Sequence, residues 1–543
     1  MKPRPSSLTA FAAAALGAAC ALPAGAAPDM AEHCRQMPGM AGCEAFRLPA
    51  AAAPAAADAP AMQLPGAGLP AKPAQPTPVV ELKDGDTYRL RAEVVTRTVA
   101  GAPLRLYAYN GSVPGPLLKV RQGSRVAIEF ENAIDQDTTV HWHGLRIDYR
   151  MDGVPGVGQP PVPPGGRFRY ELSFPDEGMY WYHPHIREDF QQDAGLYGNL
   201  WVLPADARAY GPVDRELALI VDDVLIEDGR QVPFGRDAAT HALMGRFGNV
   251  MLVNGDTDVR LQARVGETLR LYLTNAANAR TFALSFPGAR MKRVGGDGGR
   301  YERDAVVDTV TLAPSERAIV ELGFDHAGRV PLLHTTPARR YELGRIEVAA
   351  ADAAPGATEL RENADVQAAI AALVERFGDA PPAHVLSMHV ERAGAAAGHA
   401  MDHAAMGHGG PAPIEWEDAM GAANAAATSA DTRWVLRDEA GGAENMDVRW
   451  TFRRGEPVKI RLRNPAGGLH PMQHPIHFHG QRFVVLAVDG KPVDNHVWKD
   501  TVLVPAGSAV DIVLDPSNPG EWMAHCHIAE HLSSGMMIGF RVE

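Results

Sequence analysis

The chain has 543 residues and a formal net charge of −13 at pH 7. This acidity argues against a nucleic-acid-binding protein, because a phosphate backbone repels negative charge, and it leaves cations or neutral organic molecules as the expected partners. Beyond the N-terminal apolar run, no stretch approaches the roughly 18 uncharged apolar residues that a membrane-spanning helix requires. We therefore expect a protein without a membrane span.

The first 26 residues have the pattern of a secretory signal peptide. Lys2 and Arg4 precede an apolar run over residues 8–22, and residues 24–26 offer a small-residue cleavage site. No twin arginine is present, so the general secretory route is expected. The sequence predicts an exported, periplasmic protein, and lipidation at Cys20 is the alternative to signal cleavage.

The segment 27–78 combines a cysteine pair with an Ala/Pro-rich tract. Cys34 and Cys43 flank a short loop, and such a pair most often forms a disulfide in an oxidising compartment. A loop that captures copper is the alternative. Residues 48–78 are mostly Ala and Pro, a composition that buries too little apolar surface to fold, so we expect a flexible tether.

Residues 79–543 are long enough for three domains, and internal repeats support that number. Three segments place a glycine nine residues before an asparagine: 121–132, 264–275 and 453–464. In the first, the alternating Val126, Ile128 and Phe130 predict a half-buried strand. Short strands, Gly/Pro turns and little helical periodicity predict three antiparallel β-sandwiches, with domains at 79–205, 206–382 and 383–543.

One convincing helix is predicted at 364–377, where apolar residues recur at helical spacing, and we expect it to link domains 2 and 3. In each domain, a histidine also follows a proline by 19 or 20 residues: His183, His334 and His525. Domain 2 has Leu284 at the position that matches His141 in domain 1. Since it lacks the paired histidines, we expect domain 2 to be a structural spacer.

Ten of the 21 histidines lie in four clusters. Each cluster contains a pair that is two residues apart, and such residues share one face of a strand: His141 and His143, His183 and His185, His477 and His479, His525 and His527. A single pair of this kind is a weak signal. Four clusters together with a cysteine and a methionine indicate metal chemistry.

The fourth cluster surrounds Cys526 near the C-terminus. A thiolate from Cys526, an imidazole from His531 and a thioether from Met536 supply most of a trigonal copper site with an axial methionine, and His474 is the candidate for the second imidazole. On a strand, the neighbours of Cys526 point to the opposite face, so one segment can hold copper on both faces. A zinc site or an unliganded core cysteine is the alternative.

With these motifs in this order, the chain from about Val79 to Glu543 resembles the multicopper oxidases. The resemblance implies three cupredoxin-like Greek-key β-sandwich domains, four copper ions and reduction of O₂ to water. It implies these ligands: His474, Cys526, His531 and axial Met536 for type 1 copper; His141 and His477 for type 2; His143, His183, His185, His479, His525 and His527 for the type 3 pair. His525 and His527 would also link Cys526 to the site of O₂ reduction.

Reduction of O₂ to water consumes protons, and histidines committed to copper cannot supply them. Asp152 lies eleven residues after His141 in a Gly/Pro turn, and similar family members have an Asp at this position. We expect Asp152 to relay protons by general acid–base catalysis. The alternative is that it only begins the turn.

An insertion at 393–413 in domain 3 is rich in Gly and Ala and contains further copper-binding side chains: His399, Met401, His403, Met406 and His408. Thioether and imidazole ligands in a low-complexity tract are typical of metal sequestration, with Cu(I) favoured. Copper-detoxification oxidases of the periplasm carry Met-rich insertions at a comparable place. A tolerated surface loop is the alternative.

The sequence as a whole predicts a monomeric, exported multicopper oxidase that functions in copper tolerance. It would take single electrons from Cu(I) or from phenolic and amine donors and pass them to O₂. The alternatives are a general laccase with an incidental Met/His loop, a copper nitrite reductase, which fits poorly because its pattern lacks the type 3 histidines, and a cupredoxin-fold structural protein without metal. The intact ligand set argues against the last.

Overall fold

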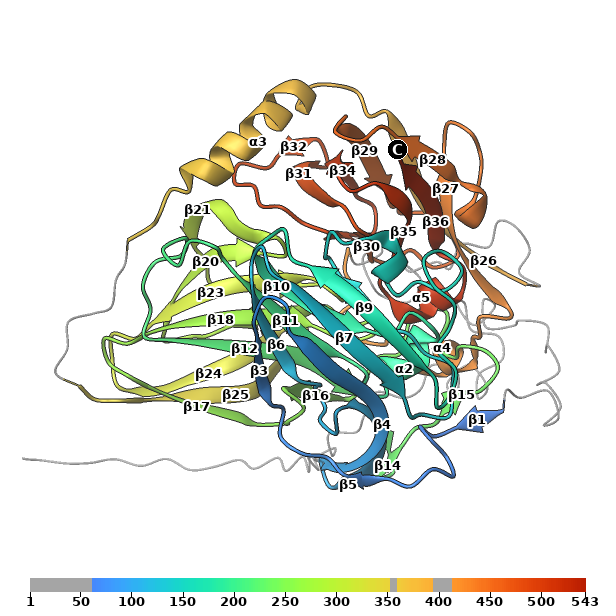
Figure 1. Ribbon diagram of the computed structural model, residues 1–543, viewed down its shortest axis with the longest axis horizontal. Coiled ribbons are helices and arrows are strands. Elements are labelled where there is room, and N and C mark those ends of the chain that lie inside the picture. Colours follow the sequence, from blue (N-terminus) through green and yellow to red (C-terminus); the bar gives the residue numbers. More distant parts are fainter. Residues whose placement is uncertain (1–60, 352–358, 394–412) are drawn as a thin grey trace, which may run out of the picture. The chain divides into compact units, whose positions relative to one another are not determined.

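The computed structural model describes residues 61–351, 359–393 and 413–543. They form mostly β-strands, arranged in six large sheets that pair into three cupredoxin-like sandwiches (Figure 1). The predicted signal peptide, Cys20, the Cys34/Cys43 pair and the five His and Met residues of the insertion lie outside the described residues. Among the residues described, no helix is long and apolar enough to cross a membrane.

The first sandwich comes from the blue-to-teal part of the chain in Figure 1. One sheet has the order β2 (Lys72–Pro73), β4 (Thr87–Val99), β7 (Arg125–Asn132), β9 (Arg167–Ser173), with β5 (Ala102–Tyr109) paired to β4. The other has the order β3 (Val79–Leu82), β6 (Leu117–Arg121), β11 (Gly198–Leu203), β10 (Gly178–His183), β8 (His141–His143). The strands β8 and β10 lie at one edge of this second sheet and end in histidines.

The second sandwich repeats this plan without histidine pairs. Its first sheet has the order β16 (Val250–Val253), β12 (Arg215–Val224), β18 (Thr268–Asn275), β23 (Arg317–Gly323), β20 (Arg290–Gly296), β21 (Gly299–Val306). Its second sheet has the order β17 (Val259–Arg264), β25 (Arg340–Ala349), β24 (Gly328–Thr335), β19 (Phe282–Ser285), β22 (Val310–Leu312).

The third sandwich ends the chain. One sheet has the order β27 (Thr432–Asp438), β26 (His384–Arg392), β29 (Val458–Arg463), β34 (Ala509–Asp515), β31 (Arg482–Val488), β32 (Lys491–Pro492). The other has the order β28 (Arg449–Phe452), β36 (Met537–Val542), β35 (Gly520–Cys526), β30 (His474–Phe478), β33 (Thr501–Val504). The adjacent strands β30 and β35 carry histidines and the cysteine.

The three expected β-sandwiches are confirmed, but their sheets are mixed, and the prediction that they are antiparallel is wrong in this respect. Each large sheet contains a parallel pair, for example β4 with β7 and β12 with β18. The cause is the Greek-key path of the chain, which crosses from one sheet to the other and back. Two strands that are distant in sequence then lie side by side in one sheet and run in the same direction.

The repeated Gly-to-Asn segments form the equivalent strands β7, β18 and β29, and the predicted alternation is confirmed, since Val126, Ile128 and Phe130 are buried. The repeated asparagine has a common structural role. The side-chain amide of Asn132 donates to the carbonyl of Val162, and those of Asn275 and Asn464 donate to the carbonyls of Leu312 and Val504. Each asparagine thereby ties the end of its strand to the segment that closes the sandwich.

The predicted helix is confirmed as α3 (Ala364–Phe377), and it contacts both flanking domains as expected. Its Val366 and Ile370 pack against Trp498 and neighbouring apolar residues of the third sandwich. At its start, Asp365 pairs with Arg300 of the second sandwich, with oxygen and nitrogen 2.7 Å apart.

Residues 61–78 do not form the tether expected for 48–78. Strand β1 (Met62–Gln63) pairs with β15 (Phe234–Gly235), and β2 pairs with β4. Leu69 and Ala71 pack against the core of the first sandwich. The prediction from composition is wrong for these residues, because a few apolar side chains and backbone hydrogen bonds to the edge of an existing strand are enough to order a segment. The domain boundaries expected at 205 and 382 stay predictions.

Candidate metal centre

One group of possible metal ligands is formed by His474, Cys526 and His531. The sulfur of Cys526 lies 3.5 Å from Nδ1 of His474 and 3.7 Å from Nδ1 of His531, and the two Nδ1 atoms are 3.3 Å apart. All three side chains are buried. Two imidazole nitrogens and one sulfur therefore face one another in a buried position. This set of donor atoms suits copper or zinc.

The register of two strands creates this group. β30 pairs with β35 so that Ile476 lies opposite Cys526, and α5 (Ala529–Ser533) then returns His531 to the cysteine. The backbone N–H of Cys526 donates to the carbonyl oxygen of Met536 at 3.1 Å, and the N–H of Met536 donates to that of His531 at 3.0 Å. The buried Met536 is thereby held beside the group.

Burial sets the protonation of these side chains. It lowers the pKa of His474 to about 3 and lowers that of His531 well below its usual value, because a buried imidazolium loses its hydration. It raises the pKa of the Cys526 thiol for the same reason. Neutral imidazoles keep a lone pair for a metal, and a buried thiolate requires a cation to stabilise it.

Eight buried histidines form a second assembly close by. Their ring nitrogens fall into three groups with atoms within 4.8 Å of one another: His141, His477 and His479; His143, His183 and His527; His185, His479 and His525. A further group joins His143 and His477 with Asp500. The sequence-predicted residues of all four motifs are thus brought together.

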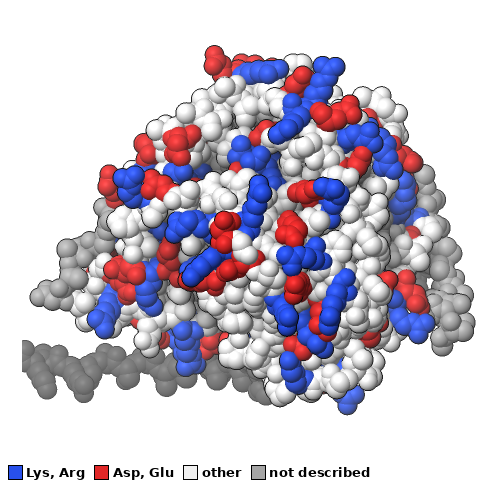
Figure 2. Space-filling view, in the orientation of Figure 1, with Lys and Arg blue, Asp and Glu red and all other residues white. Residues whose placement is uncertain are grey.

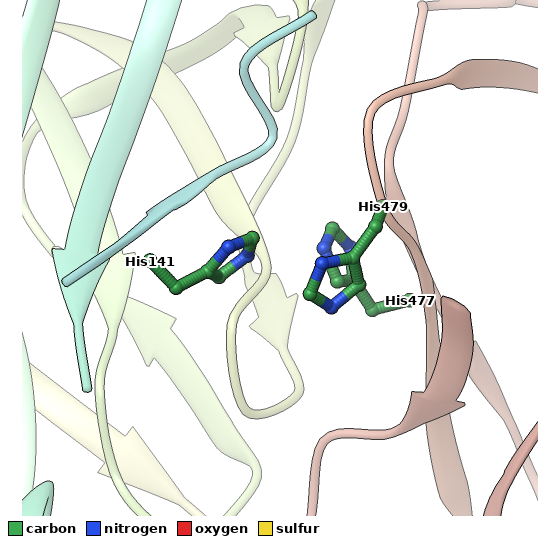
Figure 3. A group of neighbouring side chains, drawn as sticks. All are labelled: His141, His477 and His479. Atoms are coloured by element: carbon green, nitrogen blue, oxygen red, sulfur yellow. The ribbon is translucent and has the colours of Figure 1, made fainter. Parts of the chain in front are cut away.

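These histidines lie on strands of two domains. In domain 1, β8 pairs with β10 so that His141 lies opposite His183, and in domain 3, β30 pairs with β35 so that His477 lies opposite His525. Figure 3 shows His141 approaching from one side and His477 and His479 from the other. The rings of His141 and His479 stack with their centroids 4.2 Å apart.

The hydrogen bonds of these histidines leave the same ring nitrogen, Nε2, open in five of the eight. Nδ1 of His141 is 2.7 Å from the carbonyl oxygen of Asp152, and Nδ1 of His185 is 2.9 Å from a carboxylate oxygen of Glu188. Among the described residues, Nε2 has no hydrogen-bond partner in five buried members of the assembly: His141, His183, His185, His477 and His527. Buried polar atoms without partners are costly, so this pattern fits metal-binding histidines whose other nitrogen is held by the protein.

Comparison with known proteins agrees with this chemistry. Two models of the family described as multicopper oxidase match residues 91–207 and 421–543. The multicopper oxidase MmcO of Mycobacterium tuberculosis is 26% identical over 490 residues, which cover 81% of this chain and 86% of that protein. A crystal structure of a multicopper oxidase from Pseudomonas thermotolerans has a TM-score of 0.64 at 27% identity and covers 85% of this chain and 100% of that one.

This chain belongs to the multicopper oxidase family. It is accordingly an oxidoreductase that binds copper. It is also similar to copper resistance protein A of Pseudomonas syringae pv. tomato, at 28% identity over 298 residues, which cover 46% of this chain and 48% of that protein.

In this oxidase, Asp152 contacts the histidine assembly directly. Its Oδ2 is 2.7 Å from Nδ1 of His479 in domain 3, while its own carbonyl oxygen is 2.7 Å from Nδ1 of His141 in domain 1. The turn is pressed against the sheet, since a Cβ on Gly153 would lie 2.1 Å from the carbonyl oxygen of Val140. Asp152 is therefore more than a turn residue, because it links histidines from two domains.

Sequence reasoning missed several residues that hold the histidines. Oδ1 of Asp500 lies 3.6 Å from Nδ1 of both His143 and His477. The buried guanidinium of Arg317, from domain 2, donates to Oδ1 of Asp500 at 2.7 Å. Only Glu188, three residues after His185, has a local spacing that could have drawn attention to it.

Domain 2 is therefore not only a spacer. Its Ser315 contacts His143 of the assembly, and its Arg317 contacts Asp500 beside the assembly. Neither residue belongs to a local sequence motif. In the same domain, Leu284 lies opposite His334 in the register that pairs His141 with His183 in domain 1. Nδ1 of His334 accepts a hydrogen bond from the backbone of Ala283, and no described group of metal ligands includes it.

Cys526 supplies the only sulfur in the described groups of possible metal ligands. We predict that Cys526→Ser removes the intense visible absorption of the copper-loaded protein and abolishes oxidation, because a serine oxygen cannot replace the thiolate. Metal analysis should still find copper at the histidine assembly.

The matched control is Ala524→Ser, which places the same hydroxyl two residues earlier on the same buried strand. It should fold and keep the absorption. An absorption of wild-type strength in Cys526→Ser would show that Cys526 is not a ligand of the coloured copper.

Proposed function

We propose that this protein is an exported oxidase with four copper ions that oxidises Cu(I), or phenolic and amine donors, and reduces O₂ to water. Type 1 copper would be held by His474, Cys526, His531 and Met536. Type 2 copper would be held by His141 and His477, and the type 3 pair by the remaining six: His143, His183, His185, His479, His525 and His527. One observation carries the proposal, namely that the segment 525–527 contributes to both groups of ligands.

Copper, when bound, would supply the one-electron oxidation of the donor and the four-electron reduction of O₂. The protein provides the connection between the two sites, since Cys526 is covalently joined to His525 and His527. Burial lowers the pKa of both histidines well below the usual value, so that neutral imidazoles face the site. The enclosed arrangement also excludes bulk water from the assembly.

Asp152 is our proposed proton relay. The support is geometric: the carboxyl group is buried, one oxygen contacts His479, and the other, Oδ1, has no hydrogen-bond partner among the described residues. That oxygen is 3.3 Å from Nδ1 of His141. It is therefore placed to accept a hydrogen bond from water at the assembly and to pass on a proton.

The substrate class is supported by charge and by burial. An acidic protein attracts cations, and on the face shown in Figure 2 the described Asp and Glu side chains alternate with Lys and Arg, without the basic stripe that nucleic acid requires. His474 and His531 are 1% and 0% exposed. The indole of Trp434 stacks on His531 with ring centroids 4.0 Å apart, so a bulky donor cannot touch either imidazole directly.

The similarity to copper resistance protein A supports a role in copper tolerance, and the predicted signal peptide supports export. The alternative is a general laccase, in which the insertion at 393–413 is incidental. Replacing its five His and Met side chains while keeping its length separates these two functions.

The first test concerns proton supply. Asp152→Asn keeps the size and the turn but removes a carboxylate that can carry a proton, so we predict that the reduced enzyme reoxidises at least about tenfold more slowly, a barrier increase of about 1.4 kcal/mol. It should keep its copper and its colour. Stopped-flow mixing of the reduced protein with O₂ measures the rate.

Asp148→Asn is the matched control, since this carboxylate lies four residues earlier and pairs with Arg150 at the surface. It should reoxidise like the wild type. A wild-type rate in Asp152→Asn would remove the relay role and leave Asp152 as a link between histidines.

The second test concerns the donor. A variant with serine at His399, Met401, His403, Met406 and His408 should lose about tenfold in kcat/KM for Cu(I), roughly 1.4 kcal/mol, and keep its kcat/KM for a phenol. O₂ consumption measures both. The flanking backbone bonds, from Ala393 to Asp431 and from Ala506 to Pro413, are untouched. Equal losses for both donors, or no loss, would favour the laccase.

A further inference from the structure

Ser315 of domain 2 has an unusual backbone conformation. It lies between β22 and β23, is fully buried, and has a φ of 76°, in the left-handed region that favours glycine. Its N–H donates to the carbonyl oxygen of Asn275 at 2.8 Å, which fixes the turn. A non-glycine residue held in such a conformation is strained and persists only where its surroundings require it.

The hydroxyl of Ser315 contacts two residues from other domains. Its Oγ lies 2.5 Å from Nε2 of His143 in domain 1 and 3.3 Å from the hydroxyl oxygen of Thr501 in domain 3. The Thr501 oxygen is in turn 3.2 Å from Nδ1 of His477. A single hydroxyl of domain 2 therefore lies between histidine-bearing segments of both copper-binding domains.

His143 differs from most of the assembly in which ring nitrogen has a hydrogen-bond partner. Among the described residues, the nitrogen of His143 that lacks a hydrogen-bond partner is Nδ1, whereas it is Nε2 in five other histidines of the assembly. Since Ser315 occupies Nε2, Nδ1, which lies 3.6 Å from Oδ1 of Asp500, remains the atom that can face a metal. His143 thus has the opposite arrangement to these five neighbours, and the hydroxyl of Ser315 lies at its Nε2.

The strained turn is held by a buried guanidinium. Nη1 of Arg317 donates to the carbonyl oxygen of Ser315 at 2.9 Å and to Oδ1 of Asp500 at 2.7 Å, and its Nε donates to the carbonyl oxygen of Met179 at 2.7 Å. These bonds attach the turn to all three domains. They supply the surroundings that keep Ser315 in its conformation.

We propose that Ser315 is a positioning residue for the copper cluster: its hydroxyl holds Nε2 of His143 so that Nδ1 faces the metal, and domain 2 thereby takes part in building the site. This inference rests on the proposed copper sites. The other explanation of Ser315 is that it only fills space in the interface.

Two substitutions separate these explanations. Ser315→Ala removes the hydroxyl and keeps the Cβ in the left-handed conformation, whereas Ser315→Gly removes the hydroxyl and relieves the strain. If Ser315 only fills space, the glycine variant should bind copper like the wild type. If the hydroxyl positions His143, both variants should be impaired at the cluster, whatever their stability.

The experiment uses the full chain loaded with copper. We expect both variants to lose about tenfold or more in copper affinity at the histidine assembly, the usual effect of removing a group that orients a metal-binding histidine. The electron paramagnetic resonance signal of type 2 copper and the near-ultraviolet absorption of the type 3 pair should change. The visible absorption of type 1 copper should not, and the unfolding midpoint of the metal-free glycine variant should be no lower than that of the wild type.

Ala100→Gly is the matched control, because Ala100 also has a positive φ, 48°, but lies exposed in the turn between β4 and β5. It should leave both spectra unchanged. Wild-type copper affinity and spectra in Ser315→Gly would overturn the inference alone. A wild-type protein that binds no copper at the histidine assembly would overturn the proposed function and this inference together.

Discussion

The pairing of β30 with β35 is the constraint on which the rest of the site depends. It places Ile476 opposite Cys526 and His477 opposite His525, so the sulfur and the flanking histidines fall on opposite faces of one strand. A slip of one residue would exchange these faces and separate both groups of ligands. The sandwich fixes the register because the apolar residues of both strands, such as Ile476 and Ala524, are fully buried.

The second requirement is that buried charges be paired across the domains. Arg317 is fully buried and contacts Asp500, while Lys499 lies 3.0 Å from Asp297 and 3.2 Å from Glu316. Unpaired charges at these positions would be strongly destabilising, so the network favours one arrangement of domains 2 and 3. Because Asp500 also lies beside His143 and His477, the same network contacts two histidines of the assembly.

Local patterns in the sequence were sufficient for much of this architecture. The alternation at Val126, Ile128 and Phe130 and the periodicity of 364–377 have short-range causes, and both are confirmed. The histidine pairs were recognisable because residues two apart share a strand face. Ser315, Arg317 and Asp500 were not recognisable, because the contacts of Ser315 with His143, of Arg317 with Asp500 and of Asp500 with His143 join segments more than a hundred residues apart. The ordering of 61–78 was also missed, since it depends on strand edges supplied by distant parts of the chain.

In the proposed function, one strand end, 525–527, connects two separate copper sites. X-ray diffraction from crystals of the copper-loaded protein, recorded on both sides of the copper absorption edge, tests it most directly. We expect one copper peak between His474, Cys526 and His531 and three among the eight histidines, next to the ring nitrogens without hydrogen-bond partners. A copper peak at the cysteine with none among the histidines, or the reverse, would contradict it.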